Sequence, residues 1–279
     1  MIAAARDLLH GLRERAEIRR ADAVVVSYPK SGRTWLRLLV GRALAAHHGL
    51  FDEAERDPDL LLRPERLARR SAAMPSVVFS HDDRPHTKAP DAFETDKRRY
   101  AGTRVVFLHR DPRDVAVSQW FSLTRRTAGG YGGSLSEFVR DEAIGPANHI
   151  AYLNVWARAE LPAVRFAGYE ALHADTPGVL ASLLAWMGAA GVPRETVDEA
   201  VAFGAFDRMR AMEAAGTFRS GMLRPADASD AASFKTRSGT VGGYREHLSD
   251  SDIAHLDALI AERLDPRYGY ARELPGRGG

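Results

Sequence analysis

Four short apolar runs are the feature of this chain that most restricts its fold. They are Ala23–Ser27, Ser76–Ser80, Arg104–His109 and Ala163–Ala167. Each is rich in β-branched residues and nearly all apolar, as expected of strands buried on both faces of a parallel sheet. Helical patterns lie between and after them, at 34–47, 112–126, 135–143, 148–160, 177–188, 194–202 and 250–263. This alternation predicts an α/β fold with a doubly wound parallel sheet flanked by helices.

The size of the chain suits one large α/β domain or at most two small ones, and we expect a single domain. It has 279 residues, of which 45% are hydrophobic, enough for one large core. We expect a lead-in helix over residues 1–20, a core over 21–270 and a flexible tail over 271–279. No run approaches the ~18 apolar residues that cross a bilayer, and the N-terminus does not read as a secretory signal. The sequence therefore predicts a cytoplasmic protein without membrane insertion.

Composition excludes several kinds of chemistry. There is no cysteine, which rules out disulfides, thiolate metal sites and cysteine nucleophiles. The formal charge is +2, and the basic residues are mostly interspersed with acidic ones. This pattern suits a small anionic ligand and does not form the basic stripe of a nucleic-acid binding protein.

A polar loop follows the first predicted strand, at the edge of the sheet where α/β proteins bind ligands. It reads SYPKSGRTW over residues 27–35 and leads into an apolar-periodic helix. Lys30 and Arg33 lie at the start of this helix, where each cation opposes the helix dipole by about 0.3–1 kcal/mol. An anion bound by backbone N–H groups and by the hydroxyls of Ser31 and Thr34 would explain them. Taken alone, the loop could also be an ordinary turn with surface arginines.

A second cationic motif follows the third predicted strand. Arg110 stands at the carboxyl end of that strand, and Ser118 lies about two turns into the next helix. Asp111 is a suitable N-cap for this helix, and Asp114 would complete a capping box. A guanidinium with a hydroxyl above it can clamp a second phosphate. Considered singly, a surface arginine and a helical serine would be the default interpretation.

Together these segments resemble the family of sulfotransferases that use PAPS (3′-phosphoadenosine 5′-phosphosulfate), which includes the cytosolic sulfotransferases. SYPKSGRTW is similar to the family's 5′-phosphosulfate loop, usually written YPKSGTTW, and RDPRDVAVS, from Arg110 to Ser118, resembles its 3′-phosphate motif. FKTRSGTVGGYREH, which starts at Phe234, resembles its late motif R-K-G-x-x-G-D-W. The motifs keep the family's order, so the resemblance covers roughly residues 20 to 270.

The resemblance implies a set of residues that bind PAPS. They are Lys30, Ser31, Gly32, Arg33, Thr34 and Trp35 in the 5′ loop, Arg110 and Ser118 in the 3′ motif, Arg237, Ser238 and Gly239 in the late motif, and Tyr169 and Phe206 at the adenine. For Phe206, plain core packing is the alternative. The implied reaction moves a sulfuryl group in line from PAPS to an acceptor hydroxyl and leaves PAP. No metal is expected.

Three residues are implied in the transfer itself. His81 directly follows the second predicted strand, where the family places its catalytic base, and its titration range suits that role. Lys30 would stabilise charge on the leaving oxygen, and Ser118 would restrain Lys30 until the acceptor binds. Asp82 could orient the imidazole or replace it as the base.

The chain departs from the family pattern at several positions. Arg33 replaces a threonine of the 5′ loop, an added charge that the resemblance does not explain. Phe79 stands where a lysine is usual, two residues before the base, and Ser238 replaces a lysine at the 3′-phosphate. The family's C-terminal dimer motif, K-x-x-x-T-V-x-x-x-E, should begin near Arg245, where the chain reads REHLSDSDIA. The usual dimer is therefore not supported, and the oligomeric state stays open.

Two other functions fit parts of this pattern. A P-loop-like ATP-dependent kinase or nucleotide hydrolase would need magnesium and would show no preference for a 3′-phosphate. A non-catalytic nucleotide or nucleic-acid binding protein would leave His81 inert and bind polyanions with a steep salt dependence. The Arg110 and Ser118 pair argues against the first, and the nearly balanced charge argues against the second.

The acceptor is the least determined part of the prediction. Residues 82–100, 127–133 and 216–233 are expected to form walls or lids of its pocket. Their mixture of Arg, His, Asp and Ser suggests a polar acceptor such as a carbohydrate or a glycosylated metabolite. A phenol or a lipid alcohol is the alternative.

Overall fold

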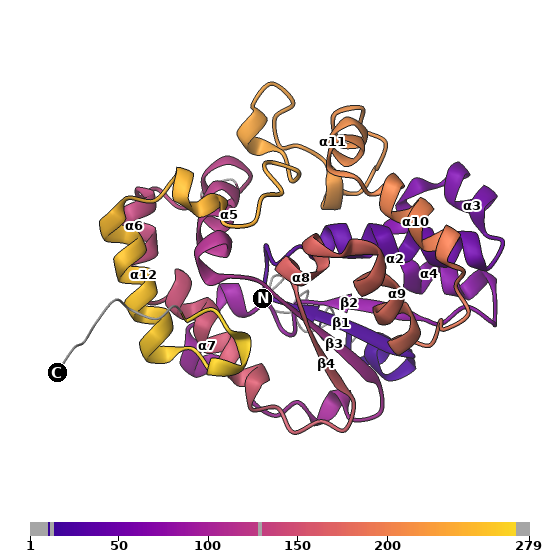
Figure 1. Cartoon of the computed structure of the whole chain (residues 1–279), viewed down its shortest axis with the longest axis horizontal. Helices are drawn as coiled ribbons and strands as arrows, with labels where there is room; N and C mark the ends of the chain where they lie inside the picture. The colour runs from indigo at the N-terminus through magenta and orange to yellow at the C-terminus, as the bar shows by residue number, and fades with distance from the viewer. Residues whose placement is uncertain (1–10, 12–13, 128–129, 272–279) are drawn as a thin grey trace, which may run out of the picture.

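The structure is a computed structural model, and it describes residues 11, 14–127 and 130–271. At its centre lies a four-stranded parallel sheet with the strand order β2-β1-β3-β4 (Figure 1). The strands are β1 (Ala23–Ser27), β2 (Val77–Ser80), β3 (Arg104–His109) and β4 (Val164–Gly168). Val25 of β1 pairs with Phe79 on one side and with Val106 on the other. All four predicted strands are confirmed, each within one residue of its expected bounds.

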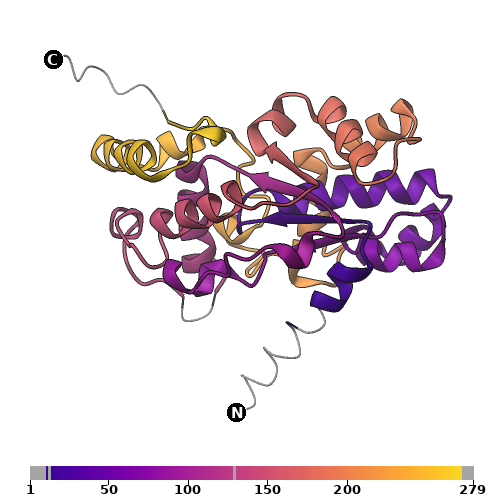
Figure 2. The same ribbon diagram turned by 90° about the horizontal axis from the view of Figure 1, so that it is seen from below.

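Helices cover both faces of this sheet (Figures 1 and 2). On one face lie α2 (Arg33–His47), α9 (Thr176–Trp186) and α10 (Arg194–Phe203), and on the other lie α5 (Pro112–Arg125), α7 (Pro146–Ala157) and α12 (Asp250–Arg263). Alternate residues of β1 show the division, because Ala23 and Val25 pack into the first core whereas Val24 and Val26 pack into the second. Two-sided burial explains the all-apolar strands, and the doubly wound α/β fold is confirmed.

The shorter helices are where the sequence pattern failed. The structure adds α3 (Phe51–Arg56), α4 (Pro64–Leu67), α8 (Tyr169–Ala174) and α11 (Phe206–Ala214), and it ends the helix expected over 135–143 early, as α6 (Leu135–Val139). Turns of 3-10 helix occur at Pro58–Leu62, Ala68–Arg70, Pro85–Thr87, Pro90–Ala92, Arg98–Tyr100, Gly221–Leu223, Ala231–Ser233, Gly243–Glu246 and Pro266–Tyr268. One or two helical turns are too short for the 3.6-residue period to stand out from the sequence.

The two ends of the chain are described only in part. Of the expected lead-in helix, residues 14–20 are helical, and Glu14 accepts a hydrogen bond from the hydroxyl of Ser80 at the end of β2. The expected tail lies outside the described residues from position 272 onward, as do residues 128–129 of the glycine-rich loop. In the described part of the chain, no helix combines the length and the apolar character that crossing a membrane requires.

Candidate active site

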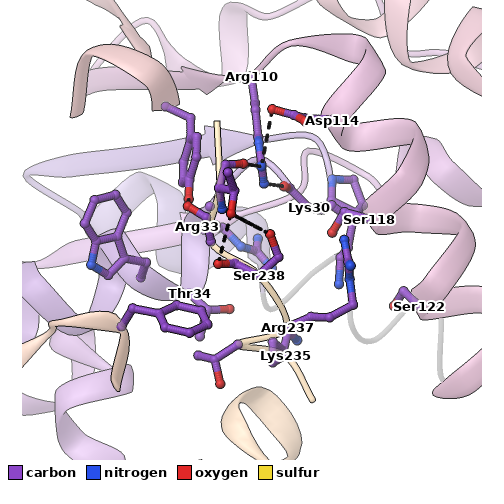
Figure 3. Close-up of a pocket in the computed structure, with 18 of the residues that line it drawn as sticks. Lys30, Arg33, Thr34, Arg110, Asp114, Ser118, Ser122, Lys235, Arg237 and Ser238 are labelled. Carbon is purple, nitrogen blue, oxygen red and sulfur yellow. Dashed lines mark hydrogen bonds and ion pairs between the residues drawn. The ribbon is translucent and has the colours of Figure 1, made fainter. Parts of the chain in front are cut away.

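The residues that follow the four strands meet at one edge of the sheet. Lys30 follows β1, His81 follows β2, Arg110 follows β3 and Tyr169 follows β4. Because parallel strands end at the same edge, these side chains come together although 139 positions separate the first from the last in numbering. They line a cavity of about 590 Å³ (Figure 3).

The cavity collects almost the whole predicted set. Its walls include Lys30, Gly32, Arg33, Thr34, Trp35, His81, Arg110, Ser118, Tyr169, Phe206, Arg237, Ser238 and Gly239. The exception is Ser31, whose hydroxyl is buried and has no hydrogen-bond partner among the described residues. The predicted residues therefore line one cavity, although they come from segments far apart in the sequence.

The loop after β1 has an unusual backbone. Lys30 has φ of 73° and Gly32 has φ of 93°, so two residues of the turn lie in the left-handed region. For the non-glycine Lys30 this conformation costs on the order of 1 kcal/mol. At Gly32 a Cβ atom would also lie 2.4 Å from the ring of Tyr169. The loop thus presents the start of α2 to the cavity and lets Tyr169 pack against its backbone.

Lys30 lies among like charges. Burial, together with the charges of Lys235, Arg126, Arg110 and Arg237, lowers the pKa of Lys30 to about 7. No side chain in the described part of the chain forms an ion pair or hydrogen bond with its ammonium group. An anion in the cavity would relieve this repulsion and restore the lysine to its charged form.

Arg110 occupies the centre of one wall. It donates hydrogen bonds to the carbonyl of Thr240 at 3.0 Å and to that of Lys30 at 3.4 Å, and it lies 3.6 Å from Asp114 (Figure 3). Its guanidinium also stacks 4.1 Å over the ring of Tyr169. Arg110 therefore joins the loop after β1 to the late motif.

The start of α5 confirms one capping prediction and corrects another. Asp111 is the N-cap, because its side chain accepts from the backbone N–H of Arg113 at 2.9 Å. Asp114 does not complete a capping box. It accepts instead from the backbone N–H groups of Gly242 at 2.8 Å and Tyr244 at 3.0 Å, because the late motif packs directly against it. This contact brings a segment 128 residues away in sequence to the cavity.

The late motif supplies a cation and a turn. Arg237 stacks 4.2 Å over Phe121 and lies 3.2 Å from Nε2 of His247, and it lines the cavity beside the hydroxyl of Ser238. That hydroxyl donates to the hydroxyl of Thr240 at 2.9 Å. In this structure no hydrogen bond joins Ser118 to Lys30, so the restraint expected between them stays a prediction.

Aromatic rings form the far end of the cavity. Trp35 and Tyr169 meet edge to face at 5.7 Å, and the indole N–H of Trp35 donates to the carbonyl of Gly204 at 3.0 Å. Phe206 is 38% exposed, so core packing is not its role. A Cβ atom at position 239 would lie 2.7 Å from the Phe206 ring, so Gly239 allows this close contact. These rings can hold a flat, partly apolar group.

His81 is held in one tautomer. Its Nδ1 lies 2.8 Å from the carbonyl oxygen of Ser27, to which only a protonated nitrogen can donate. Its Nε2 therefore carries a lone pair, and the guanidinium of Arg33 donates to it at 2.5 Å. Burial and then the charge of Arg33 hold the pKa of His81 well below its usual value. The imidazole is neutral and carries its basic nitrogen on the Arg33 side.

A comparison with known families decides the class. A family model described as the sulfotransferase domain matches residues 20–266, most of the chain. The chain belongs to the sulfotransferase family. The kinase or hydrolase alternative is therefore not favoured.

Individual relatives agree with this assignment. "Cytosolic sulfotransferase 16" of Arabidopsis thaliana is 27% identical over 92% of this chain and 81% of its own length. "3-beta-hydroxysteroid sulfotransferase" of Cavia porcellus is 22% identical over 98% of this chain and 93% of its own. Among solved structures, mouse sulfotransferase SULT7A1, complexed with PAP, superimposes with a TM-score of 0.57 at 17% identity, over 88% of this chain and 84% of that one. The similarity to this solved structure shows a shared fold.

Asp82 has a different place in this sulfotransferase from the one expected. Its carboxylate is buried among Lys97 at 2.7 Å, Trp156 at 3.0 Å, Tyr100 at 2.9 Å and Arg99. It does not line the cavity, and Ser27, not Asp82, orients His81. The physical reason is backbone geometry, because residues 82–84 all have positive φ and turn the chain away from the cavity.

The buried position of Asp82 is electrostatically compensated. Burial alone would raise the pKa of Asp82, but the charges of Lys97 and Arg99 outweigh it, and the pKa lies below its usual value. Asp82 therefore anchors the segment that carries His81 and is neither its orienting partner nor an alternative base.

Sequence reasoning missed several residues of the cavity. Lys235 lines the cavity but was not predicted to do so, although it stands within the late motif, two positions before Arg237. Its presence in that motif was the available signal. The three segments expected to form acceptor walls contribute His86, Thr127 and Leu223. His86 lies edge to face with His81 at 5.7 Å, so this part of the wall borders His81.

Proposed function

We propose that the cavity binds PAPS and that this sulfotransferase transfers the sulfuryl group to a hydroxyl of a small-molecule acceptor, which leaves PAP. The observation that carries the proposal is the excess of cations around Lys30. Five basic side chains line the cavity, namely Lys30, Arg33, Arg110, Lys235 and Arg237, whereas Asp114 is the acidic side chain among its described lining residues. A donor with phosphates at both ends and a sulfate fits this charge.

The parts of the donor correspond to parts of the cavity. The 5′-phosphosulfate would lie at the loop after β1, with Lys30, Thr34 and the N-terminus of α2 as its donors. The 3′-phosphate would lie near Arg110 and Ser118, where Arg237, Ser238 and the Gly239 backbone also converge. Trp35, Tyr169 and Phe206 would enclose the adenine. The orphaned hydroxyl of Ser31 beneath the loop is consistent with a ligand-binding turn.

The residues of the chain divide the chemical work. PAPS supplies the activated sulfuryl group. Nε2 of His81 takes the proton of the acceptor hydroxyl as the new O–S bond forms. Lys30 stabilises the electron pair left on the 5′-phosphate oxygen when the old S–O bond breaks. Before this step, the acceptor hydroxyl must replace Arg33 at Nε2, because the two compete for one lone pair.

The names of relatives and the cavity wall both bear on the acceptor class. The relative from Cavia porcellus is named for a hydroxysteroid, which supports a small-molecule hydroxyl. In this chain the wall beyond His81 contains His86, Thr127 and Leu223, a mixture of polar and apolar groups. We retain a carbohydrate or glycosylated metabolite as one candidate, and a steroid or phenol as the other. We also infer a cytoplasmic location, since the Arabidopsis relative is named cytosolic.

Ligand binding followed by turnover tests this function. Thermal shift assays should show stabilisation by PAP well above that by ATP, with and without magnesium, because ATP lacks a 3′-phosphate. Radiolabelled PAPS should then transfer label to members of a panel of sugars, glycosides, steroids and phenols, and EDTA should not stop the transfer. Stabilisation by ATP and magnesium alone would instead support a kinase or hydrolase.

A further inference from the structure

Lys235 extends into the cavity from the long loop after α11, and nothing proposed above assigns it a role. It lines the cavity (Figure 3), and no ion pair or hydrogen bond with a described residue engages its ammonium group. Lys235 is exposed toward the cavity. Desolvation by the cavity walls, together with the charges of Arg126 and Arg33, lowers the pKa of Lys235 to about 8. An unpaired lysine in such surroundings calls for an anionic partner.

A buried carboxylate fixes the backbone of this lysine. Glu213 of α11 has no exposed surface, and it accepts from the N–H of Lys235 at 2.7 Å and from the N–H of Thr236 at 2.9 Å. It also accepts from the hydroxyl of Thr236 at 2.6 Å. On the other side Arg210 donates to the carbonyl of Thr236 at 2.7 Å. The loop is therefore rigidly anchored at the point where Lys235 leaves it.

Lys235 shares its cavity with the residues proposed for the transfer. Lys30 and His81 both line that cavity, as does Arg33, the residue in contact with His81. Lys235 therefore faces the space in which the group in transfer would lie.

We propose that Lys235 is a further catalytic residue, which binds the oxygens of the sulfuryl group while it passes from the donor to the acceptor. This inference rests on the proposed function. In the transfer, the acceptor oxygen forms its bond to sulfur, the bond from sulfur to the 5′-phosphate oxygen breaks, and the acceptor proton goes to His81. Lys235 exchanges no proton. Its ammonium group donates hydrogen bonds to the sulfuryl oxygens, where it adds a second cation to that of Lys30.

The test compares turnover with nucleotide affinity in Lys235→Met. We expect kcat with PAPS to fall roughly 100- to 1,000-fold, the scale of losing one preorganised donor to a developing charge. The Kd for PAP should stay within about threefold of wild type, because PAP lacks the sulfuryl group. Lys235→Arg should recover part of the lost turnover. Glu213 accepts its hydrogen bonds from the backbone N–H groups of the loop. Neither substitution of the Lys235 side chain removes these bonds, so the loop should stay in place.

A matched control is Lys88→Met, which removes a lysine outside the cavity that pairs with Asp83. It should leave both kcat and the Kd for PAP unchanged. If Lys235→Met turned over like wild type, or if it lost PAP affinity as much as turnover, the inference would be wrong. A different result would contradict the proposed function, namely a wild-type protein that neither binds PAP nor transfers label from PAPS.

Discussion

Arg33 and His81 share one short hydrogen bond at the floor of the cavity. The guanidinium of Arg33 donates to Nε2 at 2.5 Å, while Nδ1 is bound to the carbonyl of Ser27 at 2.8 Å. The imidazole therefore stands in the tautomer that a base requires, but its basic nitrogen is occupied. Arg33, the unexplained charge of the first loop, lies where it can control access to Nε2 of His81.

Replacement of His81 by alanine tests its role as the base. Turnover should fall about 100- to 10,000-fold, the usual contribution of a positioned general base. PAP affinity should remain nearly unchanged, because the imidazole faces the acceptor side of the cavity. Steady-state assays with PAPS and calorimetry with PAP measure the two effects. Unchanged turnover would place the base elsewhere.

Arg33→Thr should change the pH dependence of the reaction. Burial and the charge of Arg33 lower the pKa of His81, so the neutral base persists into the acid range. Removing the guanidinium raises that pKa, and the acid limb of kcat/KM should move to higher pH. Profiles from pH 5 to 9 measure the shift, with Arg69→Thr, an exposed arginine outside the cavity, as the control. A limb that stays in place would separate Arg33 from the base.

Arg110→Ala should discriminate between nucleotides. A charged hydrogen bond to a phosphate contributes about 1.5–3 kcal/mol, so PAP should bind roughly 10- to 150-fold more weakly. Adenosine 5′-phosphosulfate lacks the 3′-phosphate, and its affinity should change little. Arg125→Ala, which changes an exposed arginine at the end of α5, the helix that begins two residues after Arg110, serves as control. Equal losses for both ligands would contradict a 3′-phosphate role.

PAP binding should be accompanied by proton uptake. With a pKa of about 7, Lys30 is mostly neutral at pH 8, and an anion beside it favours the charged form. Binding at pH 8 should therefore take up as much as about one proton at this residue. Calorimetry in buffers of different ionisation enthalpy measures the uptake, which should be smaller in Lys30→Met. Proton release at pH 8 would oppose the assignment.

Asp82 and its neighbour Asp83 provide a paired test of stability. Asp82→Asn leaves the buried Lys97 without its charge partner and should reduce the free energy of unfolding by about 3–5 kcal/mol. Asp83→Asn breaks a partly exposed pair with Lys88 and should cost less than about 1 kcal/mol. Both positions have positive φ, which asparagine tolerates. Urea denaturation compares them, and equal losses would show that Asp82 is not the anchor.

The sequence by itself determined the sheet and the main ligand motifs. The strands were predictable because burial on both faces demands uninterrupted apolar runs. The places of Lys30 and Arg110 were predictable because each lies within three residues of the end of such a strand, and the carboxyl ends of parallel strands share one edge. These signals are local, so they can be read before the chain is folded.

Only the tertiary structure decided which way the side chains between these motifs point. Three successive positive φ angles turn Asp82 into the core, and no periodicity in the sequence announces them. Glu213 fixes Lys235 across 22 residues, and Asp114 holds Gly242 across 128. The direction of Arg33 depends in the same way on a histidine 48 residues away. Such contacts exist only after the segments have packed, which is why His81 and Arg33 could not be paired from the sequence.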